Sequence, residues 1–203
     1  MEVLARRIAN IVSDQTSALP EDREVYGFAA ELLVSSTVDL VVVLSLAHLL
    51  GIFRPVIVAY VVIASLKYFG GGIHASKMIN CLVTGVTVCL AIGLGARALA
   101  PLPNTIAWGA FLTTGLLALA AFISYAPVEC SRKPLRSKVQ RDRLRTGAMI
   151  VVLLSLVLGL AWLIRPFTAP ELFWAGCMSL VWQSLTLLPG SQRLFDHIER
   201  QMF

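Results

Sequence analysis

The chain has 203 residues, of which 57% are apolar and only 14% are charged. A soluble domain is typically about 45–50% apolar and about 25% charged, so this composition excludes an ordinary soluble domain and indicates an integral membrane protein. The formal net charge of +5 would favour nucleic acid as the partner of a soluble protein. Beside membrane spans, however, cations set orientation and contact anionic lipid. We therefore expect membrane lipid, and no nucleic acid, as a partner.

The first segment, residues 1–19, places apolar side chains on one helical face, at Leu4, Ile8, Ile11 and Val12. It lacks the compact apolar region of a secretory signal. The spacing predicts an amphipathic helix that lies on the membrane surface. The alternative is an amphipathic helix that packs on the protein's own loops.

Apolar segments then follow one another and predict an all-α membrane bundle of about six spans in a single domain. They cover residues 31–50, 56–69, 79–100, 105–125, 147–164 and 171–188. The first four lie within 31–125, with a glycine-rich break at 70–81; a basic loop at 126–146 precedes the last two, within 147–188, and a polar tail covers 189–203. The second segment is short for a span, since about 20 residues cross the hydrocarbon core.

The cations are distributed unevenly between the two ends of these segments. Six spans place both termini on one side, together with the glycine-rich break and the basic loop, whereas only Arg54, Arg97 and Arg165 fall on the other side. Cytoplasmic loops carry an excess of Lys and Arg. We therefore expect both termini to be cytoplasmic.

The glycine-rich break carries the residues that can do chemistry. Gly70, Gly71 and Gly72 precede His74, and Cys81 follows His74 by seven residues. On one straight helix that spacing spans about 10 Å, whereas a general base must approach to about 2.6–3.2 Å. Glycine permits backbone angles closed to other residues, so we expect His74 in a folded-back loop. Cys81 is expected near the start of the third span, where a helix N-terminus favours the nucleophilic thiolate; Lys77 would favour it further.

Other interpretations of these residues remain open. Glycines also allow close helix packing, a histidine can simply lie at the interface, and a cysteine in an apolar helix is often a small core residue. The four cysteines lack the CxxC spacing of a disulfide framework or a zinc site. We interpret Cys89, Cys130 and Cys177 as structural. Asp39 is either a functional carboxylate within the membrane or a neutral or paired side chain that faces the bundle.

The segment from Lys67 to Cys81 resembles the signature of the accessory gene regulator B family (AgrB), membrane peptidases of Gram-positive peptide quorum sensing. That signature has a basic residue, two or three glycines, His-Ala and a cysteine seven residues after the histidine; here these are Gly71-Gly72-Ile73-His74-Ala75 and Cys81. Glu24-Val25-Tyr26-Gly27, Tyr125-Ala126-Pro127-Val128 and Lys133-Pro134-Leu135 are also similar to family segments. The resemblance covers about residues 20–150. Lys67 stands where the family often has arginine, so the cation is kept and the planar fork is lost.

The resemblance implies a cysteine endopeptidase of the bacterial cell membrane. Cys81 would form an acyl-enzyme thioester and His74 would carry the proton, supported by Lys67, Gly70, Gly71, Gly72 and Lys77. The acyl group would then pass to a Cys or Ser of the peptide, releasing a thiolactone or lactone autoinducer. The implied partner is a small precursor peptide with an amphipathic N-terminal helix and an acidic C-terminal tail; no cofactor and no metal are expected.

Two parts of this site remain open in the sequence. The basic loop offers Arg136, Lys138, Arg141, Arg143 and Arg145 as candidates to bind the acidic tail, and the alternative is a pure topology signal in contact with lipid. Backbone amides of the break are candidates for an oxyanion hole. A third catalytic residue is not singled out among Ser76, Asn80, Asp39 and Glu129.

Two rival functions come from other classes. A small transporter or channel would use Asp39, His48 and Lys67 as an ion path and would work without Cys81. A non-catalytic scaffold for peptide export would bind a peptide without cleaving it. Helix packing through Gly85, Gly93 and Gly95 and assembly into a homodimer are both compatible with the sequence.

Overall fold

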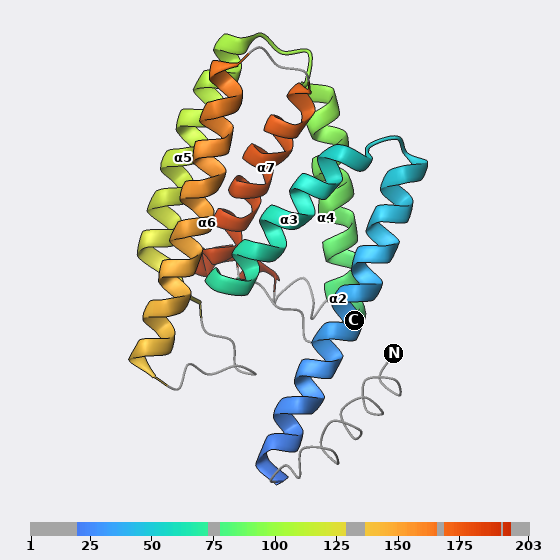
Figure 1. Ribbon diagram of the computed structural model, residues 1–203, viewed down its shortest axis with the longest axis vertical. Helices are drawn as coiled ribbons and strands as arrows, with labels where there is room; N and C mark the ends of the chain where they lie inside the picture. Colours follow the sequence, from blue (N-terminus) through green and yellow to red (C-terminus); the bar gives the residue numbers. More distant parts are fainter. Residues whose placement is uncertain (1–19, 73–77, 129–136, 166–168, 192, 196–203) are drawn as a thin grey trace.

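The computed structural model describes residues 20–72, 78–128, 137–165, 169–191 and 193–195, with the backbone alone for 20–32 and 78. In these ranges the chain forms an all-α bundle of six helices (Figure 1). The helices are α2 (Pro20–Leu49), α3 (Phe53–Gly70), α4 (Met78–Leu99), α5 (Asn104–Tyr125), α6 (Lys138–Ile164) and α7 (Pro170–Leu187). The amphipathic helix predicted for residues 1–19 lies outside the described residues.

Local sequence signals account for several helix ends. Gly71 follows α3 with a φ of 74°, and its amide donates to the Lys67 carbonyl. Pro170 opens α7 at a position where a missing amide hydrogen costs nothing. Ser137 caps α6 by accepting a hydrogen bond from the amide of Gln140. Because of this cap, α6 begins at Lys138, inside the segment 126–146 that we expected to be a loop.

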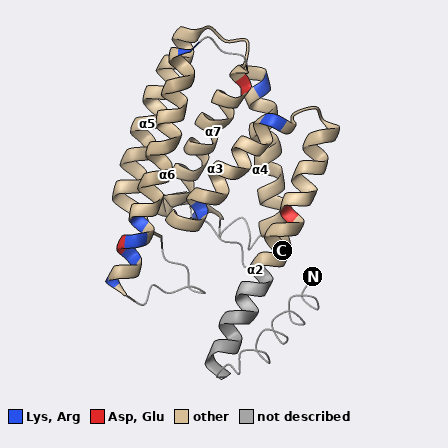
Figure 2. Ribbon diagram, in the orientation of Figure 1, with Lys and Arg blue, Asp and Glu red and all other residues tan. Residues whose placement is uncertain are grey.

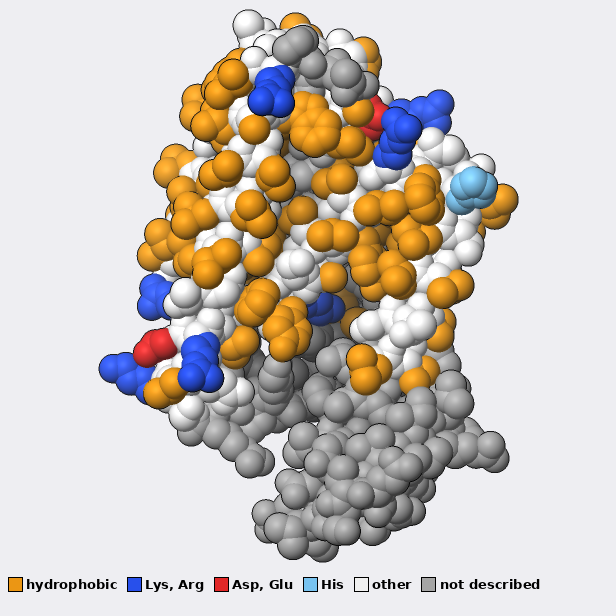
Figure 3. All heavy atoms as spheres, in the orientation of Figure 1, with side chains coloured by type: hydrophobic (Ala, Val, Ile, Leu, Met, Phe, Trp, Pro, Cys, Tyr) orange, Lys and Arg blue, Asp and Glu red, His pale blue; other side chains and the backbone are white. Residues whose placement is uncertain are grey.

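All six predicted apolar segments fall in helices, but not all of them qualify equally as spans. Four helices, α3, α4, α5 and α6, are long and apolar enough to cross a membrane. α7 becomes a fifth when it is taken together with the short bent segment that follows it, and the apolar part of α2, Leu33–Leu49, is shorter. Exposed apolar side chains cover the middle of the bundle (Figure 3). The fold is therefore that of an α-helical membrane protein.

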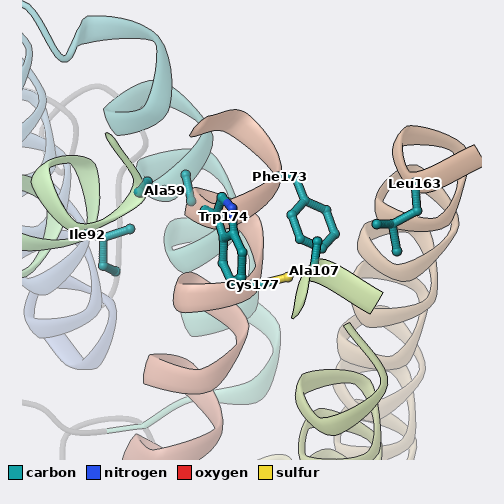
Figure 4. Close-up of a cluster of buried hydrophobic side chains, with 9 residues drawn as sticks. Ala59, Ile92, Ala107, Leu163, Phe173, Trp174 and Cys177 are labelled. Atoms are coloured by element: carbon teal, nitrogen blue, oxygen red, sulfur yellow. The ribbon is translucent and has the colours of Figure 1, made fainter. Parts of the chain in front are cut away.

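Helix α7 forms the core, since it packs against α3, α4, α5 and α6. Phe173, Trp174 and Cys177 point from α7 into a buried cluster whose other members include Ala59, Ile92, Ala107 and Leu163 (Figure 4). A second buried cluster lies toward the other end of α7, where Leu187 meets Leu66 and Phe122. The last turn of α7 is thereby brought to the end of α3, which is where the glycines lie.

The three glycines of α4 face other helices of the same chain. A Cβ on Gly93 would lie 2.5 Å from a Val56 methyl group, and one on Gly95 would lie 2.7 Å from Cε of Met178. A Cβ on Gly85 would lie 3.2 Å from both carboxylate oxygens of Asp39. These glycines let α4 approach its neighbours closely, which confirms their predicted use in packing.

Candidate functional site

The site is built around the contact between Lys67 and Cys81. Lys67 lies in the last turn of α3, and its Nζ is 3.6 Å from Sγ of Cys81 in the first turn of α4. The amides that open a helix have no partner within it, and the helix dipole adds positive potential there. An ammonium group and a helix N-terminus therefore approach the same sulfur, and both favour negative charge on it.

Cys81 differs in its surroundings from the other described cysteines. Cys89 and Cys177 are buried, with exposed fractions of 3% and 8%, whereas Cys81 is partly exposed, and all three are free thiols. Cys89 lies in the cluster that joins α2, α3 and α4, and Cys177 lies in the core around α7. Among the described cysteines, only Cys81 combines access with a cation on its sulfur.

The glycine break is held by close contacts from distant parts of the chain. A Cβ on Gly70 would lie 2.7 Å from the Phe122 ring of α5. The amide of Val128 donates to the Gly70 carbonyl over 2.9 Å. A Cβ on Gly71 would lie 2.5 Å from the Val128 carbonyl oxygen. Tyr125–Val128 and the glycines, two segments that carry the family resemblance, therefore meet in space.

Helix α7 supplies the other wall of the break. Nε2 of Gln183 donates to the Gly71 carbonyl over 2.8 Å, and the Gln183 side chain is buried. Gly72 is buried, with a φ of 133°, and a Cβ there would lie 2.9 Å from Oγ1 of Thr186. Both glycine conformations are in the region that L side chains rarely adopt. The structure therefore requires glycine at Gly71 and Gly72 for backbone geometry as well as for space.

Gln183 and Thr186 are the residues that sequence reasoning missed. The last two predicted spans carry no motif, and Gln183 is separated from Gly71 by 112 positions. The available signal was a run of polar residues, Gln183, Ser184 and Thr186, inside an apolar helix, because buried polar side chains need partners. That signal indicates a contact but not the element that provides it.

Several predicted site residues lie outside the described part of the chain. These are His74, Ser76, Lys77, Glu129, Cys130 and Arg136. The proximity of His74 to Cys81 therefore stays a prediction. Of the candidates for a third catalytic residue, Asn80 is buried and has a partner, and Asp39 is on α2 beside Gly85. One Asp39 carboxylate oxygen, Oδ1, is buried and makes no hydrogen bond within the described residues.

The basic residues of the predicted loop occupy the exposed first turns of α6. Lys138, Arg141, Arg143 and Arg145 lie at the same end of the bundle as Lys67 (Figure 2). Arg145 donates to the Ile123 carbonyl of α5 over 2.6 Å, and Arg141 also has a partner. Lys138 and Arg143 are thus the better candidates to contact a bound anion.

Of the three residues of the proposed ion path, His48 lies apart from Asp39 and Lys67, which approach α4 at Gly85 and Cys81. His48 is exposed in the last turn of α2 and lines a cavity with Arg54, whereas Lys67 contacts Cys81 near the other end of α3. Arg54 and Lys67 are separated along α3 by about 20 Å of helix. In the ranges that the structure covers, no group of three His, Cys, Asp or Glu side chains could hold a metal ion.

Comparison with known proteins shows the family to which the chain belongs. The model of the family "Accessory gene regulator B" matches residues 5–187. "Putative AgrB-like protein 2" of Clostridium perfringens (strain 13 / Type A) is 19% identical over 194 residues, covering 92% of this chain and 91% of that protein. "Putative AgrB-like protein" of Clostridium perfringens (strain SM101 / Type A) is 19% identical over 189 residues, 80% and 88% of the two chains. No solved structure matches. Since the family model spans most of its length, the chain belongs to the accessory gene regulator B family.

Proposed function

We propose that this protein is a membrane cysteine endopeptidase that cleaves a small precursor peptide and supports its cyclisation. The observation that carries the proposal is the 3.6 Å contact between Nζ of Lys67 and the accessible thiol of Cys81 at the start of α4. The thiolate is the nucleophilic form of cysteine. A cation and a helix N-terminus beside Sγ both favour that form.

The proposed reaction has two acyl-transfer steps. His74 takes the proton from Cys81, and Sγ attacks the scissile carbonyl carbon. The C–N bond then breaks, and the amine leaves with the proton that His74 returns. A Cys or Ser side chain of the bound peptide next attacks the thioester, which frees Cys81 and closes a thiolactone or lactone ring. Limited access of water protects the thioester from hydrolysis before the ring closes.

The first turns of α6 provide a docking site for the acidic tail of the precursor in this proposal. Lys138 and Arg143 are exposed at the same end of the bundle as Cys81. Cations on a surface raise the rate of association with an anionic partner, and this effect weakens with salt. Charge reversal at Lys138 and Arg143 is expected to raise KM for the precursor while the helix bundle stays intact. An unchanged KM with unchanged membrane topology would leave these cations as a topology signal only.

Cleavage of a cognate precursor in lipid vesicles tests the proposal. Mass spectrometry should detect the released C-terminal fragment with the unaltered protein and with Cys177→Ala, the matched control for a buried thiol. Cys81→Ala and His74→Ala should yield no fragment. Cleavage by Cys81→Ala would exclude the proposed nucleophile, and binding of the peptide without cleavage by the unaltered protein would favour an export scaffold.

A further inference from the structure

A cavity opens at the end of the bundle opposite the glycine break. It has a volume of about 600 Å³, and its charged or titratable lining residues are His48, Arg54, Arg97 and Glu171. These residues come from four helices: the last turn of α2, the first turn of α3, the last turn of α4 and the first turn of α7. Figure 3 shows basic side chains gathered around an acidic one at this end, with a histidine nearby.

Arg97 and His48, two of the lining residues, both lie against the turn between α2 and α3. The Arg97 guanidinium reaches over the α2–α3 turn, where a Cβ on Gly51 would lie 3.8 Å from its Nη1. Gly51 has a φ of 68°, which suits glycine in this turn. The His48 ring packs edge-on against Phe53, with centroids 6.1 Å apart. These contacts place His48 and Arg97 beside the turn that leads into α3.

The charged side chains of this cavity come from separate helices and form no ion pair with one another among the described residues. Phe53 and Arg54 supply the amides at the start of α3 that have no intrahelical partner, since Pro55 has no amide hydrogen and Val56 donates to Ile52. Such free amides at a helix N-terminus favour anions. Two guanidinium groups beside the start of a helix are the components of an oxyanion site.

We propose that this cavity binds the phosphodiester headgroup of an anionic phospholipid. The two arginines exceed the one glutamate by a single charge, which matches the single negative charge of a phosphodiester. All the charged groups lie at the ends of helices. The ends of membrane-spanning helices lie at the level of the lipid headgroups. Apolar side chains surround the site, since Leu49 is 79% exposed and Phe53 is 40% exposed. These side chains would contact acyl chains, which favours a lipid over a free phosphate ion.

The carboxylate of Glu171 indicates which phospholipid headgroup the cavity binds. It can accept hydrogen bonds from headgroup hydroxyls, as in phosphatidylglycerol, while Arg54 and Arg97 hold the phosphate. The phosphocholine headgroup of phosphatidylcholine has no net charge, and its trimethylammonium group has no hydrogen-bond donor for this carboxylate. We therefore expect phosphatidylglycerol to bind in preference to phosphatidylcholine.

Native mass spectrometry of the full chain tests the proposal. The protein, released from detergent, is titrated with phosphatidylglycerol, phosphatidylcholine or inorganic phosphate. The double variant Arg54→Gln/Arg97→Gln should lose at least about tenfold in phosphatidylglycerol affinity, because two charge-assisted contacts are removed. Arg165→Gln is the matched control, since Arg165 is an exposed cation just after α6 at the same end and does not line the cavity.

A second variant keeps the test decisive if the double variant fails to fold. Glu171→Leu retains both arginines and removes the acceptor, so it should still bind phosphatidylglycerol, with a smaller preference over lipids whose headgroups carry no hydroxyl. Equal phosphatidylglycerol binding by the double variant and by Arg165→Gln would overturn the site. Equal binding of phosphatidylcholine would overturn the charge argument, and displacement of the lipid by inorganic phosphate at similar concentration would assign the cavity to a free anion. None of these outcomes depends on peptidase activity.

Discussion

At the scale of single residues, Lys67 places a positive charge beside the sulfur of Cys81. A lysine near the end of a span is commonly expected to extend toward the membrane surface. In this protein its Nζ lies instead 3.6 Å from the sulfur of Cys81. The family resemblance implied Cys81 and His74 as a pair and Lys67 as a supporting residue, but it did not indicate the contact between Lys67 and Cys81. That contact depends on how α3 and α4 pack across the glycine break.

We expect Lys67→Met to slow alkylation of Cys81 by iodoacetamide at neutral pH. Methionine keeps much of the apolar stem and removes the ammonium group that contacts Sγ, so the attacking sulfur loses an electrostatic partner. The expected decrease in rate is about fivefold, the effect of about 1 kcal/mol from a partly exposed charge contact. Lys67→Arg retains the cation and should react at close to the original rate. The measurement is the mass-spectrometric rate of modification at Cys81; equal rates for Lys67→Met and the unaltered protein would exclude an electrostatic role for Lys67.

At the scale of helices, α7 connects the core to the site. Its first turns carry Phe173 and Trp174 of the buried cluster, and its last turns carry Gln183 and Thr186 against the glycines. The apolar runs of the sequence predicted this helix well. Its role at the site could not be predicted, because a contact between residues so far apart depends on the arrangement of the whole bundle.

The start of α6 illustrates a different limit of sequence reasoning. The charged residues between Lys138 and Thr146 resembled a loop because they are too polar for a membrane span. Polar residues still form a helix where a capping residue precedes them and an apolar helical segment follows them. Here Ser137 is the cap, and the apolar part of α6 follows. The charge pattern therefore marks where the apolar part of α6 begins and not where the helix begins.

We expect Gln183→Leu to lower kcat for precursor cleavage with little change in KM. The substitution leaves the Gly71 carbonyl without its side-chain partner, and loss of a buried hydrogen bond costs about 1–3 kcal/mol. A displaced glycine break would misplace the catalytic groups while the exposed cations of α6 stay available to the peptide. The expected decrease in kcat is about tenfold or more.

Ser184→Ala is the matched control for this prediction. Ser184 is the buried neighbour of Gln183, but its hydroxyl donates to Leu180 of its own helix. Its kcat should stay within about twofold of the unaltered protein, since no contact with the break is lost. If both variants lose activity and thermal stability together, Gln183 supports only the fold and does not position the site.

At the scale of the whole molecule, the cations of the described residues gather at the two ends of the bundle and are more numerous at the end that carries the glycine break. Lys67 and the cations of α6 lie at one end, and Arg54, Arg97 and Arg165 lie at the other (Figure 2). The apolar pattern of the sequence predicted the helical membrane fold, because each span must satisfy its own backbone hydrogen bonds. The direction in which the bundle crosses the membrane is an expectation from the positive-inside rule.

Cysteine accessibility tests that orientation. In a chain whose four native cysteines are replaced by alanine, Ser137→Cys should react with a membrane-impermeant maleimide in inverted vesicles and be protected in intact cells. Leu102→Cys, in the turn between α4 and α5, should show the opposite pattern. Both positions are exposed in the structure. Labelling of Ser137→Cys from outside intact cells would reverse the orientation and place the glycine break on the outer face.

The central claim is that Cys81 forms a covalent bond with the peptide, and trapping of that intermediate tests it most directly. The protein in lipid vesicles is mixed with a precursor whose ring-closing Cys or Ser is replaced by alanine, quenched in acid and mapped by mass spectrometry. We predict a peptide adduct on Cys81 that hydroxylamine removes, as a thioester requires, and no adduct in His74→Ala. A cleaved precursor with no adduct on Cys81, or an adduct on another residue, would contradict the account.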